Sequence, residues 1–332
     1  MKVFVTGASG FIGKAVLKNL VNNHYEVTAL LLPGEPENQI SGTAIVRGDV
    51  TQPDTLSGKM DGHNAVIHLA GAVGYQGWKT CIIINKNGTM NVVQEAVNSG
   101  IRRFIHMSSV SVYGRIPNIS IEESFPVKKI GDPYGDTKID AESIVSGYAS
   151  KGMLDLTIIR STAVYGEGDE KFLPKLIESL KSGRFRIIGN GLQSVDLIHV
   201  RDVADGVLRV LKEKKSIGKI YNLANPHNPT WNEMLKTIIL ELGIPMPDKY
   251  ISYRFAYYLA GMMEFISRFT RKPPRLNRYS IRLVGRQYNY RTDKIRNELG
   301  FTPTINLLDG IREYVKEMKK SSHDHSHNCP LS

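Results

Sequence analysis

The chain has 332 residues, and 41% of them are apolar, an ordinary value for a globular protein with a sizeable core. With only two cysteines, Cys81 and Cys329, a disulfide framework is excluded, and a reducing compartment, the cytoplasm, is predicted. The net charge of +11 indicates an anionic partner, but no nucleic-acid-binding module is recognisable, so no nucleic acid is expected. The first residues resemble a strand rather than a secretory signal, and no apolar stretch reaches the length of a membrane span.

Short apolar runs alternate with amphipathic segments through the first 115 residues. The apolar runs predict strands over residues 2–7, 26–32, 44–50, 64–71 and 103–114. Helices are predicted over 11–23 and 85–100, the second ended by Gly100. Continuous apolar strands between helices are typical of a parallel sheet covered on both faces. The predicted fold class is therefore α/β, with a Rossmann-type, doubly wound parallel sheet.

The second half of the chain leaves this sheet and returns to it. Further strands are predicted over 154–166 and 218–224, with a strand and helix over 196–214. The predicted domains are a dinucleotide-binding domain over 1–165 and 195–225, a smaller C-terminal substrate-binding lobe over 166–194 and 226–318, and a tail over 319–332. The tail is polar and lacks an apolar period, so it is expected to be disordered. Its alternating histidines, His323, His325 and His327, are attributed to solvation, and no metal site is predicted.

The stretch VTGASGFIG places Gly7, Gly10 and Gly13 between the first strand and the first helix. Glycines let the backbone turn tightly and approach a pyrophosphate at the N-terminus of a helix. The spacing is GxxGxxG rather than GxGxxG. Because the motif follows a strand and opens a helix in a βαβ series, it predicts dinucleotide binding.

The stretch PYGDTK places Tyr134 four residues before Lys138, where a helix is expected to begin. Residues i and i+4 share one helix face, and a nearby ammonium favours the phenolate form of a tyrosine. The pair could therefore move protons near neutral pH, although an exposed Tyr and Lys at this spacing also occur by chance.

Taken in order, the motifs resemble those of the extended short-chain dehydrogenases/reductases, the epimerase/dehydratase superfamily, from Met1 to about Lys319. The matching stretches are TGASGFIG, GDV at 48–50, HLAG at 68–71, NKNGT at 85–89, SSVSVYG at 108–114 and PYGDTK. The resemblance implies that Tyr134 is the general acid/base, that Lys138 lowers the pKa of Tyr134 and binds the nicotinamide ribose, and that Ser109 holds the reacting oxygen. Ser108 and Ser111 are weaker candidates for the serine role. Asn85 has a positioning role or a purely structural one.

The resemblance also implies a set of cofactor-binding residues. These are Gly7, Ser9, Gly10, Phe11, Ile12, Gly13, Leu32, Asp49, Val50, Leu69, Ala70, Gly71, Tyr134, Lys138 and Ala163. Asp49 is the expected acceptor for the adenine amine. NAD enzymes usually place an acid after the second strand and NADP enzymes an arginine, but here Leu31 and Leu32 occupy that place. With no cation expected for a 2′-phosphate, NAD is favoured and NADP is not excluded.

Two departures from the family pattern argue against a nucleotide-sugar substrate. Val195 stands where those members carry a phosphate-binding Arg, and RSTA replaces the usual RP or RYFN after the late strand. In contrast, GAVGYQGWKT and the region from Arg271 to Pro303 resemble 3β-hydroxysteroid-dehydrogenase-like and dihydroflavonol-reductase-like members. The preferred hypothesis is an NAD(P)-dependent oxidoreductase that interconverts a secondary alcohol and a ketone on an apolar, sterol- or lipid-like substrate. The alternatives are a nucleotide-sugar epimerase or dehydratase and a non-enzymatic cofactor-sensing scaffold.

The segment 251–275 combines apolar residues at helical spacing with basic ones. The apolar residues are Phe255, Tyr258, Leu259, Met262, Ile266 and Phe269, and the basic ones are Arg254, Arg268, Arg271, Lys272 and Arg275. The pattern fits either a buried helix of the smaller lobe or an interfacial helix in peripheral contact with an anionic membrane. A homodimer is compatible with the sequence, which does not determine the oligomeric state.

Overall fold

The computed structural model describes residues 1–37, 42–74, 76–114, 116–270, 274 and 276–327. The chain forms two compact units. The first contains Met1–Val164, Val200–Pro226 and Asn289–Pro303. The second contains Tyr165–His199, His227–Tyr288 and the chain from Thr304 onward.

The first unit is built on a seven-stranded parallel sheet with the strand order β11-β7-β5-β4-β1-β2-β3. The strands are β1 (Lys2–Thr6), β2 (Glu26–Leu31), β3 (Ala44–Arg47), β4 (Ala65–His68), β5 (Arg103–Ser109), β7 (Asp155–Ser161) and β11 (Lys219–Leu223). The chain runs from β1 outward through β2 and β3, and then returns to the other side of β1 with β4. In such a sheet, ligands bind at the carboxyl ends of the strands where the order reverses, here between β1 and β4. The predicted fold class is confirmed.

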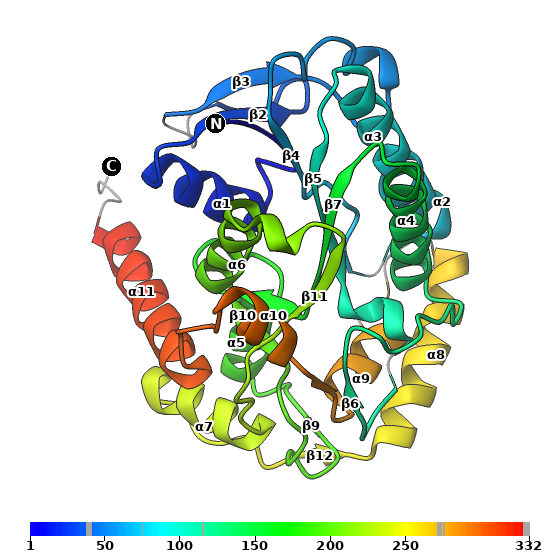
Figure 1. The fold of residues 1–332 in the computed structure, drawn as a ribbon. Helices are drawn as coiled ribbons and strands as arrows, with labels where there is room; N and C mark the ends of the chain where they lie inside the picture. The colour runs from blue at the N-terminus through cyan, green and yellow to red at the C-terminus, as the bar shows by residue number, and fades with distance from the viewer. Residues whose placement is uncertain (38–41, 75, 115, 271–273, 275, 328–332) are drawn as a thin grey trace. The chain divides into compact units, whose positions relative to one another are not determined.

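Helices cover both faces of this sheet (Figure 1). One face carries α1 (Phe11–Asn22) and α6 (Val200–Lys212), which contact each other, and the other carries α3 (Gly88–Asn98) and α4 (Pro133–Ser150). The remaining segments of the unit are α2 (Trp78–Cys81), α10 (Asp293–Leu299), the π-helix η2 (Ile82–Asn87), the 3-10 turns η1 (Pro53–Thr55), η3 (Val110–Tyr113) and η4 (Lys214–Ser216), and the short paired strands β6 (Ser120–Ile121) and β13 (Asn289–Tyr290).

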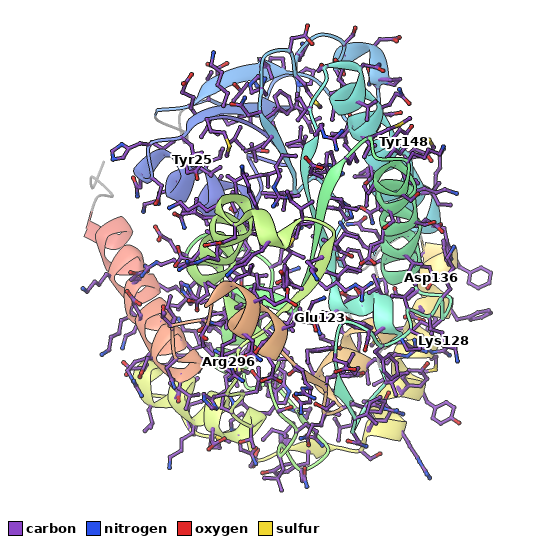
Figure 2. All side chains as sticks on the ribbon, viewed as in Figure 1. Tyr25, Glu123, Lys128, Asp136, Tyr148 and Arg296 are labelled. Carbon is purple, nitrogen blue, oxygen red and sulfur yellow. The ribbon has the colours of Figure 1, made fainter. Side chains whose placement is uncertain are left out.

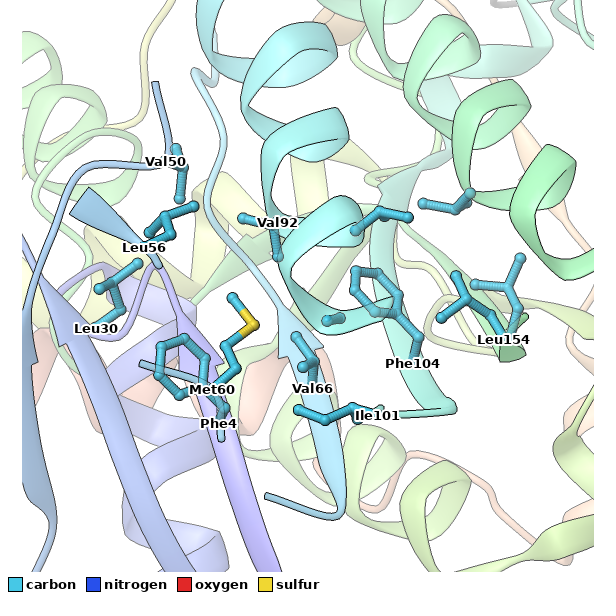
Figure 3. Packing of buried hydrophobic residues seen from close by; sticks show 14 of the residues in the cluster. Phe4, Leu30, Val50, Leu56, Met60, Val66, Val92, Ile101, Phe104 and Leu154 are labelled. Carbon is cyan, nitrogen blue, oxygen red and sulfur yellow. The ribbon is translucent and has the colours of Figure 1, made fainter. Parts of the chain in front are cut away.

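A cluster of buried apolar side chains fills the space between the sheet and α3 (Figure 3). Phe4, Val66 and Phe104 come from three adjacent strands, and Val92 comes from the inner face of α3. Alternate residues of a strand point to one face of the sheet, so these strands supply one side of the cluster. The packing holds the carboxyl ends of β1, β4 and β5 at one edge, where the sequence motifs lie.

The second unit contains mainly helices. They are α5 (Leu173–Lys181), α7 (Trp231–Leu242), α8 (Tyr253–Thr270), α9 (Arg278–Val284) and α11 (Leu307–His327). The short strands are β9 (Ile187–Ile188) and β12 (Tyr250–Ile251), which pair in parallel, and β10 (Leu197–His199), while β8 (Ala163–Tyr165) spans the boundary between the units. A capping box between Thr230 and Glu233 begins α7, and Gly243 ends it with a φ of 69°.

Three boundaries differ from the sequence-based expectation by more than one residue. Residues 195–199, which the sequence assigned to the dinucleotide-binding domain, group with the second unit. Residues 289–303 group with the first unit because β13 pairs with β6 and α10 contacts β11, whereas the sequence assigned this stretch to the smaller lobe. The tail was expected to be disordered from residue 319, but α11 continues to His327. Backbone hydrogen bonds within a helix do not require apolar side chains, so absence of an apolar period did not mark its end. Residues 328–332 lie outside the described residues.

Candidate active site

The glycine-rich turn between β1 and α1 lies close to the end of β4. Gly7 has a φ of 68°, which glycine adopts at little cost, and a Cβ there would lie 2.6 Å from the backbone nitrogen of Ala70. A Cβ at Gly13 would lie 2.1 Å from the carbonyl oxygen of Gly7. Gly10 is the N-cap of α1 and is exposed. The turn therefore leaves the N-terminal backbone of α1 accessible, as a dinucleotide pyrophosphate requires.

The residues expected at the adenosine follow the next two strands. Leu32 comes directly after β2 and is 45% exposed. Asp49 comes two residues after β3, and its Oδ1 accepts the backbone N–H of Thr51 at 2.8 Å. Val50 is buried, and its carbonyl accepts from Asn91 Nδ2 of α3 at 2.8 Å. These bonds fix the loop that presents Asp49 at the same sheet edge as the glycine turn.

Lys138 is a buried cation beside the end of β4. Only 4% of its surface is exposed, and its Nζ donates to the carbonyl of Met107 on β5 at 2.8 Å. A Cβ on Gly71 would lie 3.3 Å from this Nζ, so the ammonium lies next to the expected cofactor-lining stretch of Leu69, Ala70 and Gly71. Burial lowers the pKa of Lys138 to about 8, and the carboxylate of Glu142 opposes this effect. The side chain is therefore mostly charged at neutral pH.

The three candidate serines at the end of β5 have different contacts. Ser108 Oγ donates to Glu142 at 2.5 Å, beneath the site. Ser111 donates to Ser109 through both its backbone N–H, at 3.2 Å, and its hydroxyl, at 2.7 Å. Because Ser109 Oγ accepts both bonds, its own hydrogen remains available for a substrate oxygen. Of the three serines, Ser109 therefore has the geometry that best fits the role expected of it.

The first turn of α4 carries Tyr134 and is held against the serine segment. Pro133 occupies the first helical position, where its missing N–H has no cost. The carboxylate of Asp136, labelled in Figure 2, accepts the backbone N–H groups of Ile130 and Gly131 at 2.9 and 3.0 Å and fixes the preceding loop. A Cβ on Gly135 would lie 2.9 Å from the carbonyl oxygen of Ser111. This close approach brings the half-buried Tyr134 next to the segment that contains Ser109.

Asn85 joins the chain after β4 to helix α4. It lies in the π-helix η2 and is fully buried. Its Oδ1 accepts the N–H of Ala72 at 2.7 Å, and its Nδ2 donates to Ala72 O at 3.2 Å and to Thr137 Oγ1 at 3.1 Å. Of the two roles considered for Asn85, these contacts support positioning, because they connect the loop after β4, where cofactor contacts are expected, with the residue before Lys138. A π-bulge is frequent at functional sites.

Comparison with known proteins gives the same assignment. Residues 3–224, more than half of the chain, match the family described as NAD dependent epimerase/dehydratase family. The chain belongs to this family. The prediction of an NAD-dependent enzyme of the extended short-chain dehydrogenase/reductase type is thereby confirmed.

Relatives of this family member include reductases and dehydrogenases. The chain is 28% identical over 327 residues to a 2-alkyl-3-oxoalkanoate reductase of Stenotrophomonas maltophilia, covering 94% of this chain and 98% of the relative. It is 26% identical to the sterol-4-alpha-carboxylate 3-dehydrogenase, decarboxylating, of Mus musculus, covering 95% and 90%. Among solved structures, a dTDP-glucose 4,6-dehydratase from Streptomyces venezuelae with NAD bound has a TM-score of 0.79 at 23% identity, covering 97% of this chain and 98% of that one. At this identity the structural likeness shows the fold alone.

Beneath the site, this family member contains two stacked histidines that the sequence motifs did not single out. His68 Nδ1 is 2.7 Å from Thr6 Oγ1, and its Nε2 is 3.0 Å from Thr89 Oγ1. Burial, and secondarily the charge of Lys138, lowers the pKa of His68 to about 3. The ring of His106 stacks on it at 5.5 Å, and neither ring nitrogen of His106 has a hydrogen-bond partner among the described residues. Both rings are therefore neutral at physiological pH.

A buried ion pair lies on the other side of the serine strand. Arg160 Nη2 is 2.6 Å from Glu142 Oε2, and their side chains are 4% and 8% exposed. Arg160 also donates to the hydroxyl of Tyr113 at 2.9 Å, and Tyr113 donates to Asn222 at 2.7 Å. This network holds β5, β7 and β11 in register behind Ser108. Glu142 comes four residues after Lys138 on α4, a spacing that could have identified it from the sequence.

The remaining expected cofactor residues lie in three places. Ser9, Phe11 and Ile12 are half-buried in the glycine turn and first helical turn, and Ala163 is half-buried in β8. A cation that the sequence did not indicate lies near the end of β2, because Arg47 of β3 donates to the carbonyl of Leu32 at 3.0 Å. Within the described ranges there is no group of three or more His, Cys, Asp or Glu side chains placed to hold a metal ion, and no helix is long and apolar enough to cross a membrane.

Proposed function

We propose that the protein interconverts a secondary alcohol and a ketone on an apolar, sterol- or lipid-like substrate, with Ser109, Tyr134 and Lys138 as its catalytic residues. The observation that supports this proposal most strongly is the buried ammonium of Lys138, one helical turn from Tyr134 and adjacent to Gly71. Burial of a cation costs free energy, so a buried cation in a candidate site indicates a role that requires its charge. Here it lies between the expected cofactor stretch and the acid/base residue.

Each residue has a distinct part in the proposed mechanism. NAD, when bound, accepts or supplies the hydride. Tyr134 takes the proton from the alcohol oxygen in the oxidation direction and returns it to the carbonyl oxygen in the reduction direction. The charge of Lys138 favours the phenolate form of Tyr134, while the Ser109 hydroxyl donates to the reacting oxygen and holds it in place. Asn85 and Gly135 position these groups without contacting the substrate.

The substrate class is supported by two observations. The relatives named above act, by their names, on an oxoalkanoate and a sterol carboxylate. Val195 also offers no charge to a sugar nucleotide phosphate. The alternative, a nucleotide-sugar epimerase or dehydratase, rests on similarity in fold.

A substrate screen separates these two functions. Hydroxy and keto lipids and nucleotide sugars are tested with both nicotinamide cofactors, and reduced-cofactor absorbance is followed. We expect turnover with members of the lipid set. Because epimerases and dehydratases can act without net change in the reduced cofactor, the products of the nucleotide-sugar reactions are also separated and identified. The proposal would be overturned if a nucleotide sugar is converted and none of the hydroxy or keto lipids is.

We also propose that residues 251–275 contact a membrane surface; of the basic residues in this segment, Arg271, Lys272 and Arg275 lie outside the described residues. Helix α8 buries small residues, Ala256 and Ala260, against Ile281 of α9. Six large apolar residues of α8 point outward, each between 49% and 75% exposed: Phe255, Tyr258, Met262, Phe265, Ile266 and Phe269. Six such side chains at helical spacing form a continuous apolar face, and a large exposed apolar face is typical of an interaction site. The structure thus favours the interfacial alternative over a buried helix.

The charge of this region supports an anionic lipid surface as the partner. Arg254 is exposed at the start of α8, and Arg278 and Arg286 are exposed in and after α9. The single acid of α8, Glu264, accepts the backbone N–H of Arg278 at 2.7 Å and lies 3.9 Å from its guanidinium. A basic residue near an anionic surface contributes about 1 kcal/mol, and the contribution decreases with salt. A cytoplasmic location and a homodimer stay predictions.

Vesicle flotation tests this contact. We expect the protein to float with anionic phosphatidylserine-containing vesicles at low salt, less at high salt, and still less when Phe265 and Phe269 are both replaced by Ser. Leu240 of α7 is 69% exposed and provides the control, because Leu240→Ser removes an exposed apolar side chain from another helix of the same unit. The contact is refuted if the wild-type protein does not float at low salt, or if the control loses as much binding as the α8 variant.

A further inference from the structure

The chain after β2 turns back toward the strand end. Pro33 and Gly34 occupy the central positions of a tight turn, in which the N–H of Glu35 donates to the carbonyl of Leu32 at 3.2 Å. Gly34 has a φ of 85°, as the third residue of a type II turn requires, and Pro33 suits the second. The turn therefore places Glu35 beside Leu32, although it lies three residues further along the chain.

The carboxylate of Glu35 connects this turn to the glycine loop. Its Oε2 accepts the backbone N–H of Leu32 at 2.9 Å, and its Oε1 accepts the hydroxyl of Ser9 at 3.0 Å. Two carboxylate oxygens offer about four acceptor positions, and these bonds use two of them. The group thus retains capacity to accept hydrogen bonds at the point between the glycine loop and the end of β2, where a dinucleotide places its adenosine ribose.

Arg47 lies beside the same turn but is engaged by acceptors. It ends β3 and pairs in register with Leu31. Its Nη1 donates to the carbonyls of Leu32 and Glu35 at 3.0 and 2.6 Å, and its Nη2 forms an ion pair with Glu37 at 2.6 Å. Arg47 is therefore a cation beside the expected ribose position, and Glu37 compensates its charge.

We infer that Glu35 accepts the 2′-hydroxyl of the adenosine ribose, and that Glu35 and Glu37 together keep Arg47 from pairing with a 2′-phosphate. The inference rests on the dinucleotide site proposed for the glycine turn. A carboxylate accepts a hydroxyl and repels a phosphate, so Glu35 performs from the turn the role that Leu32 cannot perform at the strand end. The choice of cofactor then depends on the turn and on the Arg47–Glu37 ion pair, and NAD(H) is preferred over NADP(H).

Dissociation constants measured without turnover test this assignment. Binding of NADH and NADPH is followed by the fluorescence of the reduced nicotinamide, and binding of ADP-ribose and its 2′-phosphate is followed by calorimetry. In each pair, the wild-type protein should bind the ligand that lacks the 2′-phosphate, NADH or ADP-ribose, more tightly. In Glu35→Gln the ratio of the dissociation constant of NADPH to that of NADH should decrease at least about tenfold, equivalent to about 1.4 kcal/mol.

Three further variants separate the two acids and the cation. Glu37→Gln should tighten NADPH binding and leave NADH binding unchanged, because it releases Arg47 without altering Glu35. Adding Arg47→Gln to Glu35→Gln/Glu37→Gln should remove the gain in NADPH binding. Glu26→Gln is the matched control, because Glu26 lies at the opposite end of β2 with its side chain 70% exposed.

The outcomes distinguish this inference from the proposed function. If neither dinucleotide binds the wild-type protein, the dinucleotide site itself is wrong. If both bind and Glu35→Gln leaves their ratio within twofold of the wild-type value, the site stands and the role of Glu35 is refuted. If the ratio decreases but NADPH binding does not depend on Arg47, the part of the inference that concerns Arg47 is refuted. Circular dichroism of each variant verifies that it is folded.

Discussion

The region beneath the candidate site and helix α8 both reverse the usual distribution of residues, but in opposite ways. The first unit buries Lys138, Glu142, His68 and Asn85, whereas α8 exposes six large apolar side chains. These four side chains are hydrogen-bonded within the unit, so the cost of removing them from water is offset locally. No described contact covers the apolar face of α8. Buried polar groups that are hydrogen-bonded within the fold indicate a functional site, whereas an exposed apolar face without a covering contact indicates a binding partner.

The largest expected effect is on catalysis. Tyr134→Phe should reduce kcat by 10²- to 10⁴-fold, the usual effect of removing an acid/base group, and leave the dissociation constant of the cofactor nearly unchanged. Lys138→Ala should impair both, because Lys138 also lies beside the cofactor stretch. Steady-state kinetics and cofactor titrations provide both measurements. A near wild-type rate in Tyr134→Phe would eliminate the mechanism.

The second prediction concerns the compensation of buried charge. Glu142→Gln should lower the free energy of unfolding by about 3–5 kcal/mol, because it leaves the buried guanidinium of Arg160 without its counter-ion. Denaturant unfolding measures the loss. The surface pair of Lys2 and Glu26, at 3.7 Å, is the control, and Glu26→Gln should cost at most about 1 kcal/mol. Equal losses in the two variants would show that the buried pair does not stabilise the fold in this way.

A third prediction follows from the histidine pair and concerns acid stability. The pKa of His68 is lowered from 6.5 to about 3, so the folded protein keeps the ring neutral while the unfolded chain binds a proton. Stability is therefore fully present above about pH 6.5 and decreases as the pH falls toward 3. Burial also lowers the pKa of His106. His106→Phe should remove one buried titrating group and its two unpartnered nitrogens, and so reduce the slope of melting temperature against pH between 6.5 and 4.

The control for this prediction is the wild-type protein measured at the same pH. Carboxylates also destabilise the protein in acid, so the wild type and His106→Phe are compared with each other at each pH. The two proteins should differ least at pH 7.5 and most near pH 4. Parallel curves would mean that His106 does not contribute to acid lability.

The sequence predicted the parts of the site that lie close together in the chain. The glycine turn, the Tyr134–Lys138 pair and the strands that carry them depend on local spacing, and the structure places them at one sheet edge. The histidine pair could not be predicted in the same way. His68 and His106 face each other only because β4 and β5 are neighbours in register, and strand order is a property of the whole sheet.

Glu35 and α8 show two other limits of sequence-based prediction. Glu35 lies beyond the strand end in the sequence, and only the turn at Pro33 and Gly34 returns it to Leu32. The period of α8 predicted one apolar face, but periodicity does not determine whether that face is buried. The small residues Ala256 and Ala260 form the packed side instead.

The smallest expected effect is on the stability of α8. Phe269 is 74% exposed, so Phe269→Ser removes little buried surface and should change the free energy of unfolding by no more than about 0.5 kcal/mol. Leu56, fully buried in the first-unit cluster, provides the contrast, and Leu56→Ala should cost about 2–5 kcal/mol. Denaturant unfolding of both variants in the absence of lipid measures the difference. A loss of several kcal/mol in Phe269→Ser would mean that the apolar face is covered in solution, for instance by a second copy of the chain. In that case the loss should diminish on dilution, because the stabilisation from subunit contacts increases with the logarithm of protomer concentration.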